Sequence, residues 1–158
     1  MALVKELTDV PALGPAAALV LWTDVSRWPT FVEGFAHAER LDPSWPAEGA
    51  RVVWRSIPSG RGRVTERVTA FEAPSEGGEG RIVTEVFEDA LSGVQTASFR
   101  PADEPDESWL ELSLEYTLTS SGALRQITDV LFIRRALSAA LRRTLERFAV
   151  EAAEQGAL

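Results

Sequence analysis

Arg134 is a charged residue inside an apolar pattern, and a residue of that kind can anchor a ligand. It lies seven residues after Ile127 and seven before Leu141, on the apolar stripe of a predicted helix. A guanidinium there must find an anionic partner or reach water. It could hold the carboxylate, enolate or phenolate of a ligand. A structural ion pair with a strand carboxylate, or a side chain that extends to solvent, would also explain Arg134.

Glu66 is the second candidate, because it alternates with Val64 and Val68 in a predicted strand. If that face points inward, Glu66 is a buried carboxyl with a raised pKa and could act as a general base. It could instead be the partner of Arg134. A β-bulge could also change the register, because Phe71 has the opposite parity to Val68.

Two ring side chains could contribute a proton or a hydrogen bond. Tyr116 ends the apolar face of the last predicted strand, where its hydroxyl needs a partner. It is therefore a candidate acid or ligand contact, with a core tyrosine as the alternative. His37 is the only histidine and alternates with Phe35 and Glu39. We expect it to be a core or rim residue rather than a catalyst.

Other strand residues could complete a ligand site. Gln95 alternates with Ala97 and Phe99 and could donate to a ligand carbonyl, although an exposed strand residue would fit the same pattern. Trp54 could line a cavity or pack in the core. The residues predicted to bind a ligand are Phe35, His37, Trp54, Glu66, Gln95, Phe99, Leu112, Tyr116, Arg134 and Leu137. Of these, Arg134, Glu66 and Tyr116 are the candidates for catalysis.

The composition excludes several classes of site. The chain has 24 acidic and 16 basic residues, a net charge of −8, so we predict no nucleic-acid partner. It has no cysteine, which excludes thiol nucleophiles and disulfides. Glu85, Glu88 and Asp89 match no known cation-binding loop. We therefore predict no metal and no cofactor.

The chain shows no signal for a membrane span or for export. Its longest wholly apolar stretch is residues 16–22, whereas a span needs about 20 residues. Its start lacks a basic segment followed by an apolar run. We expect a cytoplasmic protein.

The elements that must position these residues follow a simple order. Residues 2–9 predict a strand, and Pro15 begins a short helix over 16–22. A second short turn follows, with Ser26 as a possible cap. Residues 33–120 contain strands rich in Val, Thr and aromatic residues, separated by turns, which predicts an antiparallel meander.

Residues 123–154 contain no Gly or Pro and predict one long helix. Its apolar stripe runs through Ile127, Val130, Leu137, Leu141, Leu145, Phe148 and Ala152. Such a helix suits a small domain only if a curved sheet wraps it. We therefore predict one α+β domain over residues 1–158: an antiparallel seven-stranded sheet curved around a long C-terminal helix, with two short helices after strand 1.

Three segments carry a family resemblance: residues 21–31 (LWTDVSRWPTF), 49–54 (GARVVW) and 64–72 (VTERVTAFE). They resemble the Bet v 1/START-like (SRPBCC) superfamily, and within it the bacterial polyketide cyclase/dehydrase and lipid-transport group. The resemblance implies the helix-grip fold, with a deep cavity between the sheet and the long helix. Members bind sterols, lipids, plant hormones or polyketides, and some catalyse aromatisation and cyclisation.

We predict that the chain binds or carries a hydrophobic small molecule, such as a lipid, a sterol or a polyketide-like compound, without catalysing a reaction. The alternative is an aromatase/cyclase-like enzyme acting on a polyketide intermediate. There, Arg134 with Tyr116 or Glu66 would supply an acid or base and an oxyanion partner. A third hypothesis is an interaction module. Phe132 lies off the apolar stripe and could form a homodimer contact.

Overall fold

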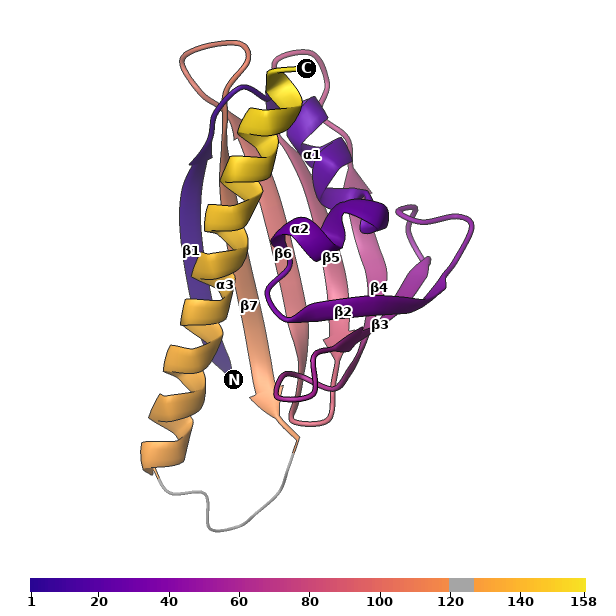
Figure 1. The fold of residues 1–158 in the computed structure, drawn as a ribbon, viewed down its shortest axis with the longest axis vertical. Helices are drawn as coiled ribbons and strands as arrows, with labels where there is room; N and C mark the ends of the chain where they lie inside the picture. Colours follow the sequence, from indigo (N-terminus) through magenta and orange to yellow (C-terminus); the bar gives the residue numbers. More distant parts are fainter. Residues whose placement is uncertain (120–126) are drawn as a thin grey trace.

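Seven strands form one antiparallel sheet in the computed structural model, which describes residues 1–119 and 127–158. The strands are β1 (Ala2–Val10), β2 (Phe35–Leu41), β3 (Arg51–Ser56), β4 (Arg63–Glu72), β5 (Gly80–Phe87), β6 (Leu91–Pro101) and β7 (Ser108–Leu118). Their order is β1-β7-β6-β5-β4-β3-β2, so β2 to β7 form a meander and β1 pairs with β7 (Figure 1). The predicted sheet is confirmed.

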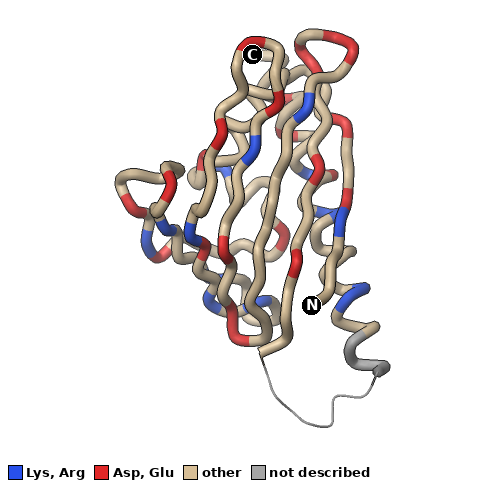
Figure 2. The backbone as a smooth tube through the Cα atoms, turned by 180° about the vertical axis from the view of Figure 1, so that it is seen from behind, with Lys and Arg blue, Asp and Glu red and all other residues tan. Residues whose placement is uncertain are grey.

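The two faces of the sheet differ because side chains alternate along each strand. On β7, Leu110, Leu112 and Leu114 are buried, whereas Trp109 is 42% exposed on the opposite face. Seen from behind, that outer face is not covered by a helix and carries charged residues along its strands (Figure 2). Lys5 forms an ion pair with Glu111 there, at 3.7 Å. The inner face is therefore the one that can form a pocket.

A bulge in β4 decides which of its side chains point inward. The pairing of β4 with β5 shifts register between Val68 and Ala70, as the parity of Phe71 predicted. Before the bulge, Val64, Glu66 and Val68 all lie buried on the inner face. The sequence alternation therefore holds through Glu66, and the bulge follows it.

Short helices cover one part of the inner face. They are α1 (Pro15–Thr23), the 3-10 turn η1 (Val25–Arg27) and α2 (Trp28–Phe31). Pro15 takes the first helical position, as predicted. Asp24, rather than Ser26, caps the next turn, because its carboxylate accepts from the backbone N–H of Ser26 at 3.1 Å. The Trp28 indole donates to the carbonyl oxygen of Trp22 at 2.8 Å and ties the helices together.

The long helix α3 (Ile127–Gly156) packs along β1 and against α2 (Figure 1). Residues 123–126, which we also predicted to be helical, lie outside the described residues. The later part of the predicted stripe is buried: Leu141, Leu145, Phe148 and Ala152. The first turns of α3 extend past the end of β1 (Figure 1). No helix in the described part of the chain is long and apolar enough to cross a membrane.

Aromatic rings join the helices to the sheet. The ring of Phe148 on α3 lies 5.0 Å from that of Phe31 and 5.3 Å from that of Trp22. Phe99 on β6 contacts the same group, 6.3 Å from Trp22. These edge-to-face and stacked contacts fix α1 and α2 over the sheet. They also fill one end of the space beneath α3.

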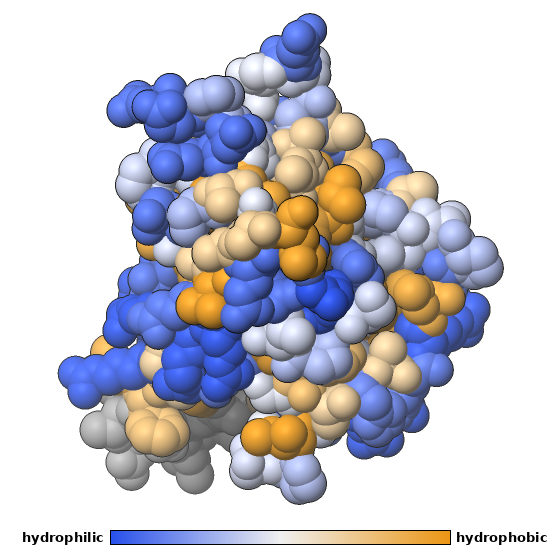
Figure 3. All heavy atoms as spheres, turned by 45° about the horizontal axis from the view of Figure 1, so that its top comes forward, coloured by the Kyte–Doolittle hydropathy of each residue, from blue (hydrophilic) through white to orange (hydrophobic). Residues whose placement is uncertain are grey.

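Large apolar side chains also occur on the surface. Phe132 on α3 is 72% exposed and Val20 on α1 is 70% exposed. In the view of Figure 3, apolar residues gather in small patches that hydrophilic residues separate. Isolated exposed apolar residues are ordinary in single-domain proteins. A homodimer contact at Phe132 therefore stays a prediction.

Candidate ligand-binding pocket

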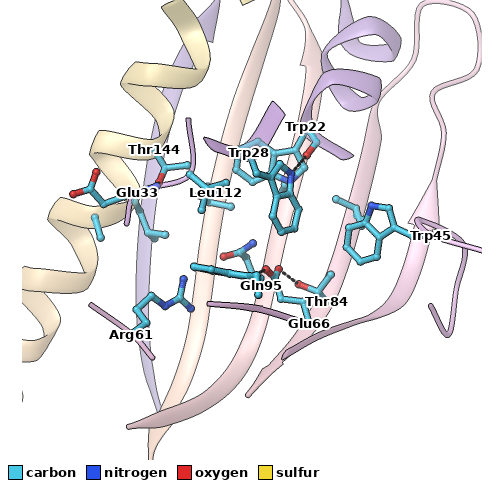
Figure 4. A pocket seen from close by; sticks show the side chains of 16 residues that line it. Trp22, Trp28, Glu33, Trp45, Arg61, Glu66, Thr84, Gln95, Leu112 and Thr144 are labelled. Carbon is cyan, nitrogen blue, oxygen red and sulfur yellow. Dashed lines mark hydrogen bonds between the residues drawn. The ribbon is translucent and has the colours of Figure 1, made fainter. Parts of the chain in front are cut away.

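One cavity, here called the central pocket, lies between the inner face of the sheet, the short helices and α3 (Figure 4). Its cavity volume is about 60 Å³, so a ligand larger than a few water molecules enters only if the walls move apart. Its aromatic lining consists of Trp22, Trp28, Trp45 and Trp54. Its polar lining consists of Glu33, Arg61, Glu66, Thr84, Gln95 and Thr144, and the rest is apolar: Val32, Ile82, Ala97, Leu112, Ala140 and Leu141.

Glu66 is the buried carboxyl of the central pocket, 7% exposed. Its Oε2 accepts a hydrogen bond from the Trp54 indole at 2.8 Å, and its Oε1 accepts one from the Thr84 hydroxyl at 3.3 Å. Burial raises the pKa of Glu66 above its usual value of 4.5, and the bonds from Trp54 and Thr84 and the charge of Arg61 offset part of that effect. Glu66 therefore points inward, which is the condition on which its possible roles depended. The partners of Glu66 are strand residues rather than Arg134.

The strand register explains why these groups meet. Trp54 on β3 pairs with Val64 on β4, so Glu66 is its diagonal neighbour on the same face. Thr84 on β5 pairs with Gln95 on β6. Three strand pairings therefore place an indole, a carboxyl, a hydroxyl and an amide in one row. Figure 4 shows Glu66, Thr84 and Gln95 of this row on the side of the pocket opposite Trp22 and Trp28.

Arg61 reaches the pocket from the turn between β3 and β4. Its guanidinium lies 5.3 Å from the centre of the Trp54 ring, a cation–π contact. It also pairs with Glu88 at 2.6 Å. The Glu88 side chain is only 3% exposed, and burial raises its pKa, although Arg61 opposes that effect. Arg61 therefore neutralises a buried carboxylate behind the pocket wall.

Glu33 forms the side of the pocket next to α3. The backbone N–H of Glu33 donates a hydrogen bond to the Thr144 hydroxyl on α3 at 3.0 Å. The Glu33 carboxylate forms ion pairs with Arg143 at 2.9 Å and with Arg147 at 2.8 Å. These contacts fasten the segment between α2 and β2 to α3. Any widening of the pocket at this edge must break them.

Four of the predicted ligand residues line the central pocket: Trp54, Glu66, Gln95 and Leu112. Phe35 lies behind them, with its ring 5.4 Å from Trp54 and 6.0 Å from Trp28. Phe99 and Tyr116 are buried in the core instead. Leu137 is half-buried and packs against the same core. None of these four is part of the pocket lining.

The two remaining predicted residues are on the surface. Arg134 is exposed on α3 and does not line the pocket, which corrects our expectation of an inward-facing guanidinium. The residues of α3 that pack against the core at this level are Ile133 and Leu137, and Arg134 lies beside that face and reaches solvent. His37 is exposed on the edge strand β2. Any functional role of these two residues stays a prediction.

Sequence reasoning missed several lining residues. Arg61 lies between Gly60 and Gly62, a pattern that indicates only a turn. Thr84 alternates with Ile82 and Val86, which are both buried. A strand predicted over these residues would therefore have predicted that Thr84 points inward. Trp28 and Trp45 come from segments outside the regular strands. Within residues 1–119 and 127–158, no group of three His, Cys, Asp or Glu is placed to hold a metal.

The sequence matches the model of one protein family over residues 1–153; the family is described as polyketide cyclase / dehydrase and lipid transport. No curated protein matches the chain. Solved structures, in contrast, resemble it over almost its whole length. All of those described below are less than 25% identical to it, so they support the fold alone.

Three of these solved structures differ in what their proteins are known to do. A hypothetical protein from Helicobacter pylori has a TM-score of 0.73 at 12% identity, covering 96% of this chain and 88% of its own. Norcoclaurine synthase from Thalictrum flavum, in complex with dopamine and hydroxybenzaldehyde, has a TM-score of 0.62 at 12% identity, covering 97% and 87%. The di-domain ARO/CYC StfQ from the steffimycin biosynthetic pathway has a TM-score of 0.68 at 15% identity, covering 99% of this chain and 52% of StfQ.

Proposed function

The chain belongs to the polyketide cyclase / dehydrase and lipid transport family, and from that premise we propose that it binds and carries a hydrophobic small molecule in the central pocket. The ligand would be a lipid, a sterol or a polyketide-like compound. The observation that carries the proposal is the build of the pocket, with apolar and aromatic walls and one row of hydrogen-bonding groups. Pockets for small ligands are built in this way.

The two sides of the pocket would contribute different interactions to ligand binding. Trp22 and Trp28 form an apolar wall, which favours a ligand by removing apolar surface from water. Glu66 and Gln95 on the opposite side supply hydrogen bonds that fix its orientation.

A second candidate function is an aromatase/cyclase-like reaction on a polyketide intermediate. Glu66 favours it, because burial raises the pKa of its carboxyl, which makes the carboxylate a stronger base. Its carboxylate would remove a proton from carbon next to a ketone, and the Gln95 amide would stabilise the enolate oxygen. Turnover of a poly-β-ketone thioester that Glu66→Gln abolishes would favour this enzyme over a carrier.

Mass spectrometry of the purified protein tests the carrier proposal. We expect a non-covalent extra mass under native conditions that disappears on denaturation. Ala140→Phe places a ring in the pocket from α3 and should remove the extra mass. Ala136→Phe makes the same change at an exposed position on the same helix and should keep it.

The same pair of variants covers the case in which the expression host supplies no ligand. The protein is then incubated with a panel of sterols, fatty alcohols and aromatic ketones before measurement. Binding that Ala140→Phe prevents and Ala136→Phe preserves supports the proposal. If no compound binds, or if both variants bind equally well, the proposal is wrong.

A further inference from the structure

The charges that face the central pocket restrict the polar end of its ligand. Among the described residues, the charged side chains in the lining are Glu33, Arg61 and Glu66. Two of them are carboxyls. What the pocket can accept therefore depends on whether Arg61 is free to bind an anion.

Arg61 is held in place by a buried partner. It lies 2.6 Å from the Glu88 carboxylate, whose side chain is 3% exposed, and it also covers the Trp54 ring. If Arg61 turned to a ligand anion, Glu88 would remain buried without a cation, which is strongly unfavourable. The pair is therefore neutral as a unit, and it offers a ligand no net positive charge.

The basic residues near the mouth are also paired. Arg143 and Arg147 both contact the Glu33 carboxylate, and their side chains are about half exposed on the solvent side of α3. Such exposed groups can attract an anion to the surface but are screened by water and salt. They do not supply a cation inside the pocket.

Glu66, in contrast, can accept further hydrogen bonds. Each of its oxygens accepts one hydrogen bond, from Trp54 or Thr84, and a carboxylate oxygen has two acceptor positions. The Gln95 amide stands on the neighbouring strand, opposite Thr84 in the register. A hydroxyl placed between them can donate to Glu66 and accept from Gln95.

A ligand anion at the same place would meet Glu66 at contact distance in a buried region, because Glu66 is only 7% exposed. Like charges repel strongly there because the local dielectric constant is low. A carboxylate, sulfate or phosphate head is therefore disfavoured, and a ligand hydroxyl is favoured.

From these contacts we infer that Glu66 makes the central pocket selective for uncharged aromatic ligands that carry a hydroxyl group, and that it excludes anionic ones of the same shape. The inference rests on the proposed function, because it assumes that the ligand occupies this pocket. It assigns Glu66 a role in specificity that does not require catalysis.

Matched ligands test the inference by isothermal titration calorimetry at neutral pH, where naphthol is uncharged and naphthoate is anionic. We expect naphthol to bind the wild-type protein at least about tenfold more tightly than naphthoate, a ratio equivalent to about 1.4 kcal/mol. In Glu66→Gln the naphthol-to-naphthoate ratio should fall several-fold. Glu6→Gln removes a carboxylate that pairs with Arg142 outside the pocket lining and should keep the wild-type ratio.

Several results would overturn the inference. Naphthoate binding as tightly as naphthol to the wild-type protein would contradict it while leaving the pocket as a binding site. An unchanged ratio in a folded Glu66→Gln protein would remove Glu66 from the explanation. If Glu66→Gln does not fold, Gln95→Leu replaces it, and naphthol affinity must then fall several-fold. If neither naphthol nor any other apolar compound binds, the proposed function fails as well.

Discussion

The Trp54 indole N–H donates to Oε2 of Glu66 across 2.8 Å, between two neighbouring strands. Trp54 is 1% exposed and Glu66 is 7% exposed, so water does not compete for this bond. A buried polar group that loses its partner costs the full desolvation of that group. The pair therefore contributes both to the stability of the sheet and to the shape of the pocket.

Removing only the indole donor should destabilise the fold measurably. Trp54→Phe keeps an aromatic ring but leaves Oε2 of Glu66 without its hydrogen bond. We expect the free energy of unfolding to fall by about 1–3 kcal/mol, measured by urea denaturation. Trp109→Phe on the outer face of β7 is the matched control and should change it by less than about 0.5 kcal/mol. Equal effects of both substitutions would contradict the account of this bond.

The pKa of Glu66 predicts a pH dependence of stability. Since folding raises this pKa above 4.5, the folded protein binds more protons than the unfolded chain between 4.5 and the raised value. The free energy of unfolding should therefore fall as the pH rises through that range, by at most about 1.4 kcal/mol per pH unit. Glu66→Gln cannot titrate and should lose this component.

Thermal melts of both proteins from about pH 5 to about pH 8 measure the effect, because only the difference between them reports Glu66. Glu88 also has a raised pKa, but it titrates in both proteins and cancels. We expect the wild-type protein to lose stability relative to Glu66→Gln as the pH rises. Parallel curves would show that the pKa of Glu66 does not change on folding.

The contacts of Glu33 predict an effect on ligand exchange rather than on stability. Glu33→Gln removes the ion pairs to Arg143 and Arg147, which are partly exposed and together should change stability by at most about 1 kcal/mol. The segment between α2 and β2 would then separate from α3 more easily. Ligand dissociation, followed by stopped-flow fluorescence, should become several-fold faster.

The control for this variant removes a different ion pair to α3, one that comes from strand β1. Glu6→Gln removes the contact of Glu6 with Arg142, at 3.2 Å, which lies along β1. It should leave the dissociation rate unchanged. Equal acceleration by both variants would show that the charge of the whole protein, and not the Glu33 contacts, controls exchange.

Much of the fold could be predicted because its patterns are regular. The alternation of Val64, Glu66 and Val68 correctly placed Glu66 on the inner face, and the parity of Phe71 correctly indicated the bulge. The stripe of α3 was correct where a sheet or a short helix lies beneath it, as at Leu145 and Phe148.

The pocket was predictable only in part, because a periodic pattern gives the direction of a side chain only to within a neighbouring position. Arg134 lies beside Ile133 and Leu137, which pack against the core, but is itself exposed. Arg61 sits in a turn, where no periodicity gives a direction. Tyr116 has the correct strand parity but is 3% exposed in the core, on the part of the inner face that does not form the pocket.

The most direct test of the account uses the five tryptophans, whose indole N–H signals can be assigned in two-dimensional NMR spectra by single Trp→Phe variants. Trp22, Trp28, Trp45 and Trp54 line the central pocket, whereas Trp109 lies on the outer face. With a ligand identified by mass spectrometry, or with naphthol, we predict saturable shifts of the four pocket signals and an unchanged Trp109 signal. A ligand that binds but moves only Trp109, or none of the five, would contradict the claim that this pocket is the binding site.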